Sequence, residues 1–234
     1  MKKLVGGLLL ILMTTSVVAN EIYINQIGDD LDLDITQTGD NNKIGLATQD
    51  VVLQGADMTF SITQTGDTNT IDAIIKGNNY TGTWLFTGDR NTVDLLCSSS
   101  TSGDCDTVQL DIDTTGSDND YTFKIGETAS ANSSILDFTV TGDGNVIDVT
   151  LDGESAEITV VLDDGTSSLT NSAGNTNNLT ITSSGDGTTG NVVDLDITGS
   201  GGTYNVTQTG TLIDQKVTAT FNGDDANVDI TQSD

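Results

Sequence analysis

The sequence predicts an all-β fold, a β-solenoid of stacked strand-turn-strand repeats. Three observations indicate it: apolar and polar residues alternate over short segments, Gly and Asn recur at a fixed spacing between these segments, and none of the 234 residues is proline. Alternation with a period of two is typical of strands that bury one face. Because no proline removes a backbone N–H group, a continuous sheet is possible along the whole chain.

The first segment, residues 1–19, predicts a signal peptide. Two lysines precede an apolar run, Leu4–Met13, and small residues lead to Ala19. The run is too short to span a bilayer, and the small residues suit cleavage after Ala19. An N-terminal core helix is the alternative. We therefore expect a mature solenoid domain over residues 20–234 that is secreted to the extracellular space or the cell surface and does not insert into the membrane.

The expected mature domain repeats one phrase. It reads DITQTGDNN from Asp34 and SITQTGDTN from Ser61, and shorter forms begin at Asn205 and Asp229. Before the glycine of the phrase, an apolar residue or Gln stands at every second position, and Asn follows three residues after the glycine. Apolar residues follow again at alternate positions after the Asn. Each unit therefore predicts two short strands joined by a Gly-x-x-Asn turn.

One such unit cannot bury its apolar face alone. Recurrence at about 22 to 28 residues predicts an array of about eight or nine two-strand coils that stack over a shared core. In each coil a glycine supplies the tight turn or positive φ that reverses the chain. A β-sandwich with similar hairpins is the alternative. The predicted turn glycines are Gly28, Gly39, Gly66, Gly88, Gly116, Gly142 and Gly210.

Gln and Asn share the inward parity of the apolar residues. Such amides fit a core if every coil presents the same residue at the same height, because the side chains then hydrogen-bond along the stack as a ladder. Thr36, Thr38, Thr63 and Thr65 have the opposite parity, so we expect them and the intervening Asp residues to face water. The predicted ladder, which we expect to carry self-assembly, consists of Gln26, Gln37, Asn42, Gln64, Asn69, Asn91, Asn119, Asn145, Gln208 and Gln232.

This pattern resembles the curlin repeat of the subunits of curli, the amyloid fibres of the bacterial extracellular matrix. The resemblance is closest at Ile35–Asn42 and Ile62–Asn69, and it is partial at Ile22–Gly28 and Val206–Gly210. It implies a stacked β-solenoid, export through an outer-membrane secretion channel and nucleated self-assembly into fibres of a biofilm. The implied partners are further copies of the chain, a nucleator subunit and the secretion channel.

The charge of the chain limits the classes of partner that it can bind. There are 35 acidic and 7 basic residues, which gives a formal net charge of −28. This argues against nucleic acid and anionic membranes, whose phosphates require Lys and Arg, and it favours the attraction of divalent cations. The segment GDGNVIDVTLDG, from Gly142 to Gly153, is similar to the nonapeptide of calcium-binding β-rolls. We expect diffuse calcium binding along the acidic faces and no cofactor; specific calcium sites are the alternative.

Two cysteines and the absence of histidine bear on chemistry. Cys97 and Cys105 bracket the polar stretch SSSTSGD, and in an exported protein they predict a disulfide that closes this insertion. Two lone cysteines without His do not predict a metal site. Without His, and with no Ser beside an evident base, the chain is not expected to be an enzyme. A β-solenoid polysaccharide hydrolase or lyase with clustered acids is the alternative.

The sequence thus predicts an exported structural subunit of an extracellular fibre or matrix. The phrase occurs near both ends of the sequence without an evident cap, which favours end-to-end stacking. A monomeric solenoid that serves as an adhesin or as a surface or virion decoration is the second hypothesis.

Overall fold

The computed structural model describes most of the expected mature domain and one short segment before it. Within the described residues no helix is long and apolar enough to cross a membrane. The described ranges are 8–11, 20–45, 50–97, 105–126, 131–142, 144–153, 155–163, 178–184, 190–198, 202–209, 215–222 and 226–233.

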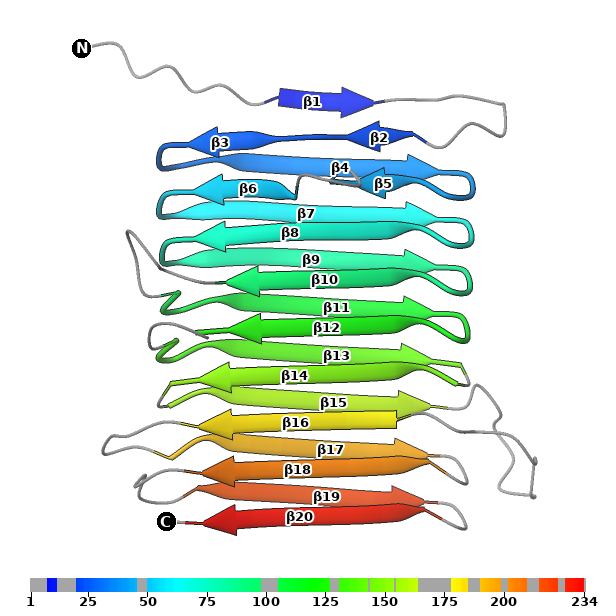
Figure 1. Ribbon diagram of the computed structural model, residues 1–234, viewed down its shortest axis with the longest axis vertical. Helices are drawn as coiled ribbons and strands as arrows, with labels where there is room; N and C mark the ends of the chain where they lie inside the picture. The colour runs from blue at the N-terminus through cyan, green and yellow to red at the C-terminus, as the bar shows by residue number, and fades with distance from the viewer. Residues whose placement is uncertain are drawn as a thin grey trace.

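The described strands form two sheets, called sheet A and sheet B here (Figure 1). The nine strands of sheet A are, in spatial order, β1 (Leu8–Ile11), β4 (Asp32–Thr38), β7 (Met58–Thr65), β9 (Tyr80–Thr87), β11 (Gln109–Thr115), β13 (Ile135–Thr141), β15 (Glu157–Asp163), β17 (Val192–Thr198) and β19 (Lys216–Asn222). The eleven strands of sheet B are β2 (Glu21–Ile22), β3 (Asn25–Ile27), β5 (Lys43–Ile44), β6 (Val51–Gln54), β8 (Thr70–Lys76), β10 (Thr92–Cys97), β12 (Asp120–Ile125), β14 (Val146–Asp152), β16 (Asn178–Ser184), β18 (Thr203–Thr209) and β20 (Asn227–Ser233).

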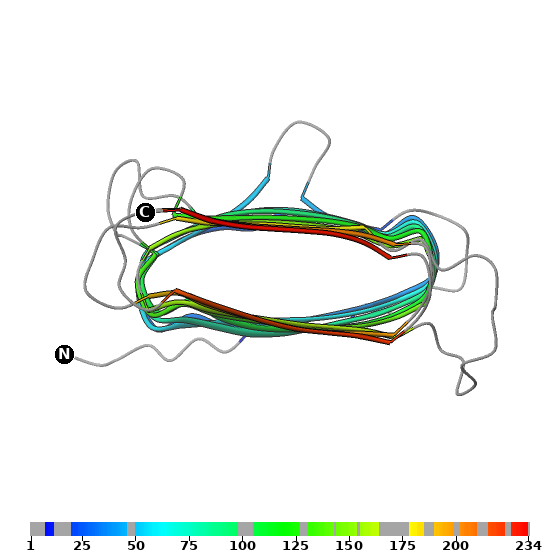
Figure 2. The same cartoon turned by 90° about the horizontal axis from the view of Figure 1, so that it is seen from below.

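The chain winds from one sheet to the other, and each strand pairs in parallel with the strand one coil away. From β4 to β20 this makes eight coils, in each of which a sheet A strand is followed by one rung of sheet B. Seen along the stack, the two sheets face each other as the walls of a flattened tube (Figure 2). The fold is therefore an all-β solenoid, which confirms the predicted fold class. A sandwich of antiparallel hairpins is excluded, because the two strands of a coil lie in different sheets.

Alternation along each strand places the core between the sheets. In β9, for example, burial alternates strictly between buried and exposed residues. An aromatic series crosses the interior from Phe60 through Trp84 and Phe123 to Phe138, with ring centroids 5.6, 6.0 and 5.0 Å apart. The indole Nε1 of Trp84 donates to the carbonyl oxygen of Phe60 at 2.8 Å, so its one polar atom is satisfied inside the core.

The predicted signal peptide lies mostly outside the described residues. Only β1 of this segment is described, and it pairs in parallel with β4, Leu8 opposite Leu33 and Ile11 opposite Thr36. It therefore takes the place in sheet A that the strand of a preceding coil would take. Cleavage after Ala19 stays a prediction.

The repeated phrase occupies two different places in the coil, so the predicted glutamine ladder is divided between the two sheets. The phrases from Asp34 and Ser61 build β4 and β7 of sheet A, whereas those from Asn205 and Asp229 build β18 and β20 of sheet B. The partial match at Ile22–Gly28 also lies in sheet B. The reason is that both turns of a coil need a backbone with positive φ, so the same Gly-ended strand can close either side.

Glycines form a column in each of the two turn regions. Gly39, Gly66, Gly88, Gly116 and Gly142 follow strands of sheet A, whereas Gly28, Gly55 and Gly77 follow rungs of sheet B, and all have positive φ. A Cβ atom on Gly66 would overlap the carbonyl oxygen of Gly39 in the coil before it. The column thus requires glycine for close stacking as well as for φ. Gly210 lies outside the described residues.

We expect Gly66→Ala to destabilise the fold by about 1–3 kcal/mol or more, because it combines an unfavourable φ of 127° with overlap on Gly39. Urea denaturation followed by circular dichroism would measure the change in the free energy of unfolding. Thr65→Ala, at the exposed neighbouring position, is the control. Equal midpoints for the two variants would contradict the steric role of the glycine column.

Candidate functional site

The turns that follow the sheet A strands hold an asparagine column. Asn69 Nδ2 donates to the carbonyl oxygen of Gly66 in its own turn at 2.6 Å. Its Oδ1 accepts the backbone N–H of Asn42 in the preceding coil at 2.9 Å. One side chain thus closes its turn and joins two coils. The structure brings together five predicted ladder residues in this column, all buried: Asn42, Asn69, Asn91, Asn119 and Asn145.

A second series of bonds runs along the outside of the same turns. Asp67 donates its backbone N–H to the Oδ1 of Asp40 at 3.1 Å, and Asp89 donates to the Oδ1 of Asp67 at 2.9 Å. Ser117 continues the series on Asp89 at 2.7 Å. This role goes beyond the expected exposure of the Asp side chains to water and to diffuse calcium. Their position directly after each turn glycine was the signal, because an Asp at that point of a turn accepts backbone N–H groups.

The glutamines of the predicted ladder form two separate pairs and no continuous series. In sheet A, Gln64 Nε2 donates to Gln37 Oε1 at 2.7 Å; in sheet B, Gln232 Nε2 donates to Gln208 Oε1, also at 2.7 Å. The sheet A pair ends because Phe86 follows Gln64 in the next coil, which leaves the buried Gln64 Oε1 without a hydrogen-bond partner.

Gln26 belongs to neither of these pairs. It stands against Leu53 of the next rung, which offers no hydrogen-bonding atom in its side chain. The expectation that all the glutamines share one ladder is therefore corrected: only neighbouring coils that both carry Gln at one height can pair.

The opposite turns use other residues for the same purpose. Asn191 accepts the backbone N–H of Ala156 at 3.0 Å and donates to the carbonyl oxygen of Gly153 at 2.8 Å, as the asparagine column does across the molecule. Ser134 Oγ accepts the N–H of Val108 at 3.2 Å. These contacts were missed because this side lacks a constant Gly-x-x-Asn spacing.

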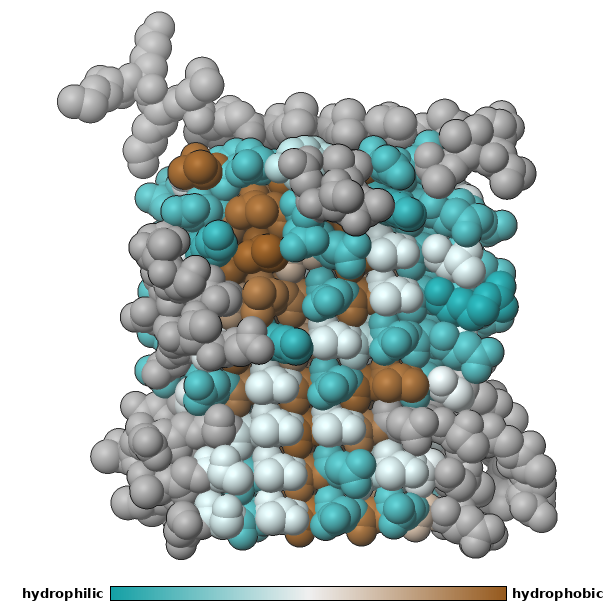
Figure 3. Space-filling view, in the orientation of Figure 1, coloured by the Kyte–Doolittle hydropathy of each residue, from teal (hydrophilic) through white to brown (hydrophobic). Residues whose placement is uncertain are grey.

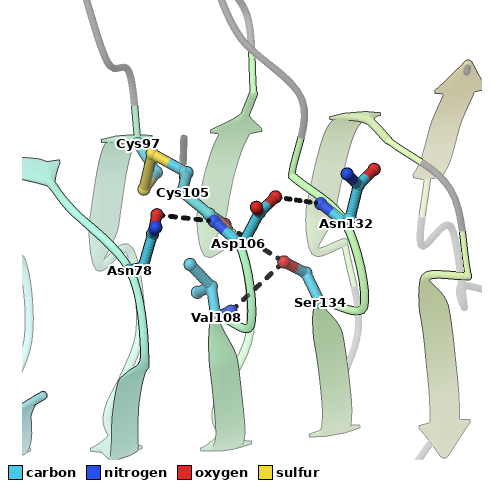
Figure 4. Close-up of a disulfide and its surroundings, with 7 residues drawn as sticks. All are labelled: Asn78, Cys97, Cys105, Asp106, Val108, Asn132 and Ser134. Carbon is cyan, nitrogen blue, oxygen red and sulfur yellow. Dashed lines mark hydrogen bonds between the residues drawn. A yellow bond between two sulfur atoms is a disulfide. The ribbon is translucent and has the colours of Figure 1, made fainter. Parts of the chain in front are cut away.

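Cys97 and Cys105 are joined by a disulfide on this side of the solenoid (Figure 4). Both cysteines are buried, and their Cα atoms are 6.0 Å apart. Next to Cys105, Asp106 donates its backbone N–H to Asn78 Oδ1 at 3.1 Å and accepts the N–H of Asn132 at 2.7 Å. The disulfide therefore closes the insertion next to a turn that is itself hydrogen-bonded to the two neighbouring coils.

Acidic side chains stack on the outer faces. On sheet A, Asp111 stands opposite Asp137. Burial, followed by repulsion from Asp113 and from the partner carboxylate, raises the pKa of Asp111 above its usual value. Burial and repulsion from Asp113 and Glu157 raise the pKa of Asp137 in the same way. On sheet B, Asp72 stands opposite Asp94, and burial together with Asp50 and Asp94 raises the pKa of Asp72.

The outer face of sheet B also carries an apolar column that the sequence analysis did not anticipate. Val52, Ile74 and Leu96 stand opposite one another in successive coils and point outward, half-buried. Figure 3 shows this face, with apolar side chains over its upper part and more polar ones below. Within the described ranges, no three His, Cys, Asp or Glu side chains are placed to hold a metal ion. Diffuse calcium binding stays a prediction.

Comparison with known proteins identifies the repeat. Residues 28–73 match the family model of the curlin associated repeat, a segment that contains the turns at Gly39 and Gly66. No curated protein and no solved structure matches the chain significantly.

We expect Asn91→Leu to destabilise the fold far more than Thr92→Leu, its exposed neighbour. Asn91 Nδ2 donates to the carbonyl oxygen of Gly88 at 2.9 Å, and its Oδ1 accepts the N–H of Asn69 at 2.9 Å. Leucine would leave the buried N–H group of Asn69 and the partly buried carbonyl group of Gly88 unpaired, at about 1–3 kcal/mol for the buried group. Urea denaturation would measure the loss, and similar midpoints for the two variants would show that the asparagine column is not a stabilising element.

The stacked acids predict a pH dependence. Because the pKa values of Asp111 and Asp137 are raised in the folded state, the folded chain binds protons more readily than the unfolded chain, so their unfavourable contribution at pH 7 is lost as the pH falls. The double variant Asp111→Asn, Asp137→Asn should have a higher urea midpoint than the wild type at pH 7. The difference should shrink below about pH 4, where Asp is protonated in both states. A difference that is constant with pH would contradict this assignment.

Proposed function

We propose that this curlin-repeat protein is an exported structural subunit of a curli-like extracellular fibre or biofilm matrix, which self-assembles by end-to-end stacking of its coils. The repeat matched at residues 28–73 supports it, since the family is associated with extracellular and cell-surface fibres. The principal partner is another copy of the chain. A nucleator subunit and an outer-membrane secretion channel are the further partners that the resemblance implies.

The observation that carries this proposal is the open edge of β20, the last strand that the structure describes. Among the described strands β20 pairs with β18 alone, so the backbone groups along its other edge have no strand partner. Its inward-facing residues Val228 and Ile230 are 40% and 41% exposed, whereas Tyr204 and Val206, which precede them in the same columns, are buried. An open edge with exposed apolar side chains is a template for another strand.

The fold and the repeat point to a structural protein and not to an enzyme. The interior between the sheets is filled with apolar side chains and paired amides. The outer faces carry carboxylates in short stacks, such as Asp111 with Asp137 and Asp72 with Asp94. The proposed role therefore depends on the outer faces of the two sheets and on the free edges of the terminal strands.

One observation favours the second hypothesis, a monomeric adhesin or surface decoration. The core is shared by eight coils within a single chain, so most of the interior of a lone solenoid is buried without a partner. The formal charge of −28 also opposes the approach of two copies. Self-assembly would join copies at the ends of the stack once salt screens their charge. A monomeric adhesin would keep these ends free at every salt concentration.

We expect assembly to be slow at low ionic strength and to accelerate with salt. At 0.01 M salt the Debye length is about 30 Å, so the acidic side chains of neighbouring copies repel one another. Calcium or magnesium should act more strongly than sodium at matched ionic strength, because divalent cations can bridge neighbouring carboxylates. Thioflavin fluorescence and electron microscopy of the purified chain would measure it. Monomers at every salt concentration, even after seeding with fragments, would refute self-assembly and favour the adhesin.

A further inference from the structure

The two ends of sheet B carry the same pattern of inward residues. At one end these are Ile22, Ile24 and Gln26 of the β2–β3 rung, and at the other end they are Val228, Ile230 and Gln232 of β20. The strand registers connect the two sets through the whole sheet. Val228 continues the column of Ile22, Ile230 that of Ile24, and Gln232 that of Gln26.

The direction of the amide bonds leaves an acceptor at one end and a donor at the other. Gln232 Nε2 donates toward the preceding coil, to Gln208 Oε1 at 2.7 Å, so its own Oε1 remains to accept from a following coil. Gln26, at the opposite end, rests on Leu53 and finds no amide there. A second copy placed after β20 would bring Gln26 Nε2 to Gln232 Oε1 with the same polarity as the bond between Gln232 and Gln208.

Charge is compatible with the same register. With Gln26 on Gln232, the outward residues that meet are Asn25 on Thr231 and Tyr23 on Asp229, and no two like charges face each other. A shift by two residues would put Asp229 on Glu21 and would lose the amide pair. Within the chain, by contrast, Asp72 faces Asp94 directly. The two ends of sheet B are thus less repulsive to each other than some coils within the chain.

We infer that copies dock head to tail through sheet B, with β20 of one copy on the β2–β3 rung of the next, in the register that pairs Gln232 with Gln26. This rests on the proposed function and specifies its interface. In sheet A the same docking leaves β19 two strand spacings from the partner's β4, because the rung between them is the position that β1 holds on β4. The full chain fills that position with β1; a chain that starts at Asn20 leaves it open.

A rival docking would place β19 directly on β4 of the next copy. It would bring Lys216 to Asp32, but it would also put Phe221 on Gln37, and β20 would have to displace β2 and β3 from β5 and β6. The sheet B docking displaces no strand, and it pairs Gln232 with Gln26, whereas the rival places Gln37 against Phe221.

Cysteine cross-linking distinguishes these interfaces. Neighbouring parallel strands place opposed Cα atoms about 4.8 Å apart, within the range that a disulfide bridges. We expect fibres of the double variant Asn25→Cys, Thr231→Cys to form covalent dimers and higher oligomers on mild oxidation, in the full chain and in residues 20–234 alike. Both positions are exposed, and they lie at opposite ends of the stack, so a link between them joins two copies.

Two matched variants serve as controls. Ile27→Cys, Thr231→Cys moves one cysteine by two residues, which separates the Cα atoms by about 8 Å and should prevent the link. Asp34→Cys, Thr218→Cys reports the rival docking in sheet A and should not link, because the docking proposed here keeps those strands about 10 Å apart. Linkage of either control pair at the yield of the first pair would overturn the inferred register.

The same experiment separates this inference from the proposed function. Fibres that form but do not link through positions 25 and 231 would overturn the sheet B docking and leave the fibre function standing. Absence of fibres from every variant and from the unmodified chain would overturn both. Links through 25 and 231 alone, with fibres visible by electron microscopy, are the result that we expect.

Discussion

Stacking of coil on coil at a single strand spacing is the constraint on which the rest of this structure depends. Each strand pairs in parallel with the strand one coil away, so each residue meets the residue at its own height about 4.8 Å above and below it. A side chain that suits its own coil must therefore also suit its two neighbours. Gly66 shows the consequence, since a methyl group there would overlap Gly39 whatever the rest of its own turn contains.

The same constraint explains why amide side chains are buried and where their hydrogen bonds are incomplete. Asn can serve every coil because it closes its own turn and also accepts a backbone N–H from the neighbouring coil, so its partners do not depend on the neighbour's side chain. Gln has no such independence. Its amide needs another Gln at the same height, and where Phe86 replaces it the oxygen of Gln64 is left without a partner. Asn is therefore the general element of this stack, and Gln is a local one.

Repulsion between stacked carboxylates is the unfavourable side of this arrangement. Outward Asp residues keep the faces hydrated and oppose unwanted contacts between strands, but stacking places them opposite one another, as at Asp111 and Asp137. The carboxylates in the turns are better accommodated, because Asp40 and Asp67 accept backbone N–H groups of the following coil. Most of the interior is buried within one chain, and inward side chains are exposed at the last described coil, so it is at the two ends of the solenoid that the proposed assembly would occur.

The sequence by itself determined which residues point inward, since parity belongs to each strand alone: the aligned Gly-x-x-Asn turns and the inward amides follow from a period of two. It could not determine which sheet a strand joins. The phrases that end at Gln37 and Gln208 are almost the same, yet one lies in sheet A and the other in sheet B. Nor could it predict Asn191 acting across from the asparagine column. The physical reason is that the height and the sheet of a strand depend on the length of every turn before it, and only the folded stack sums those lengths.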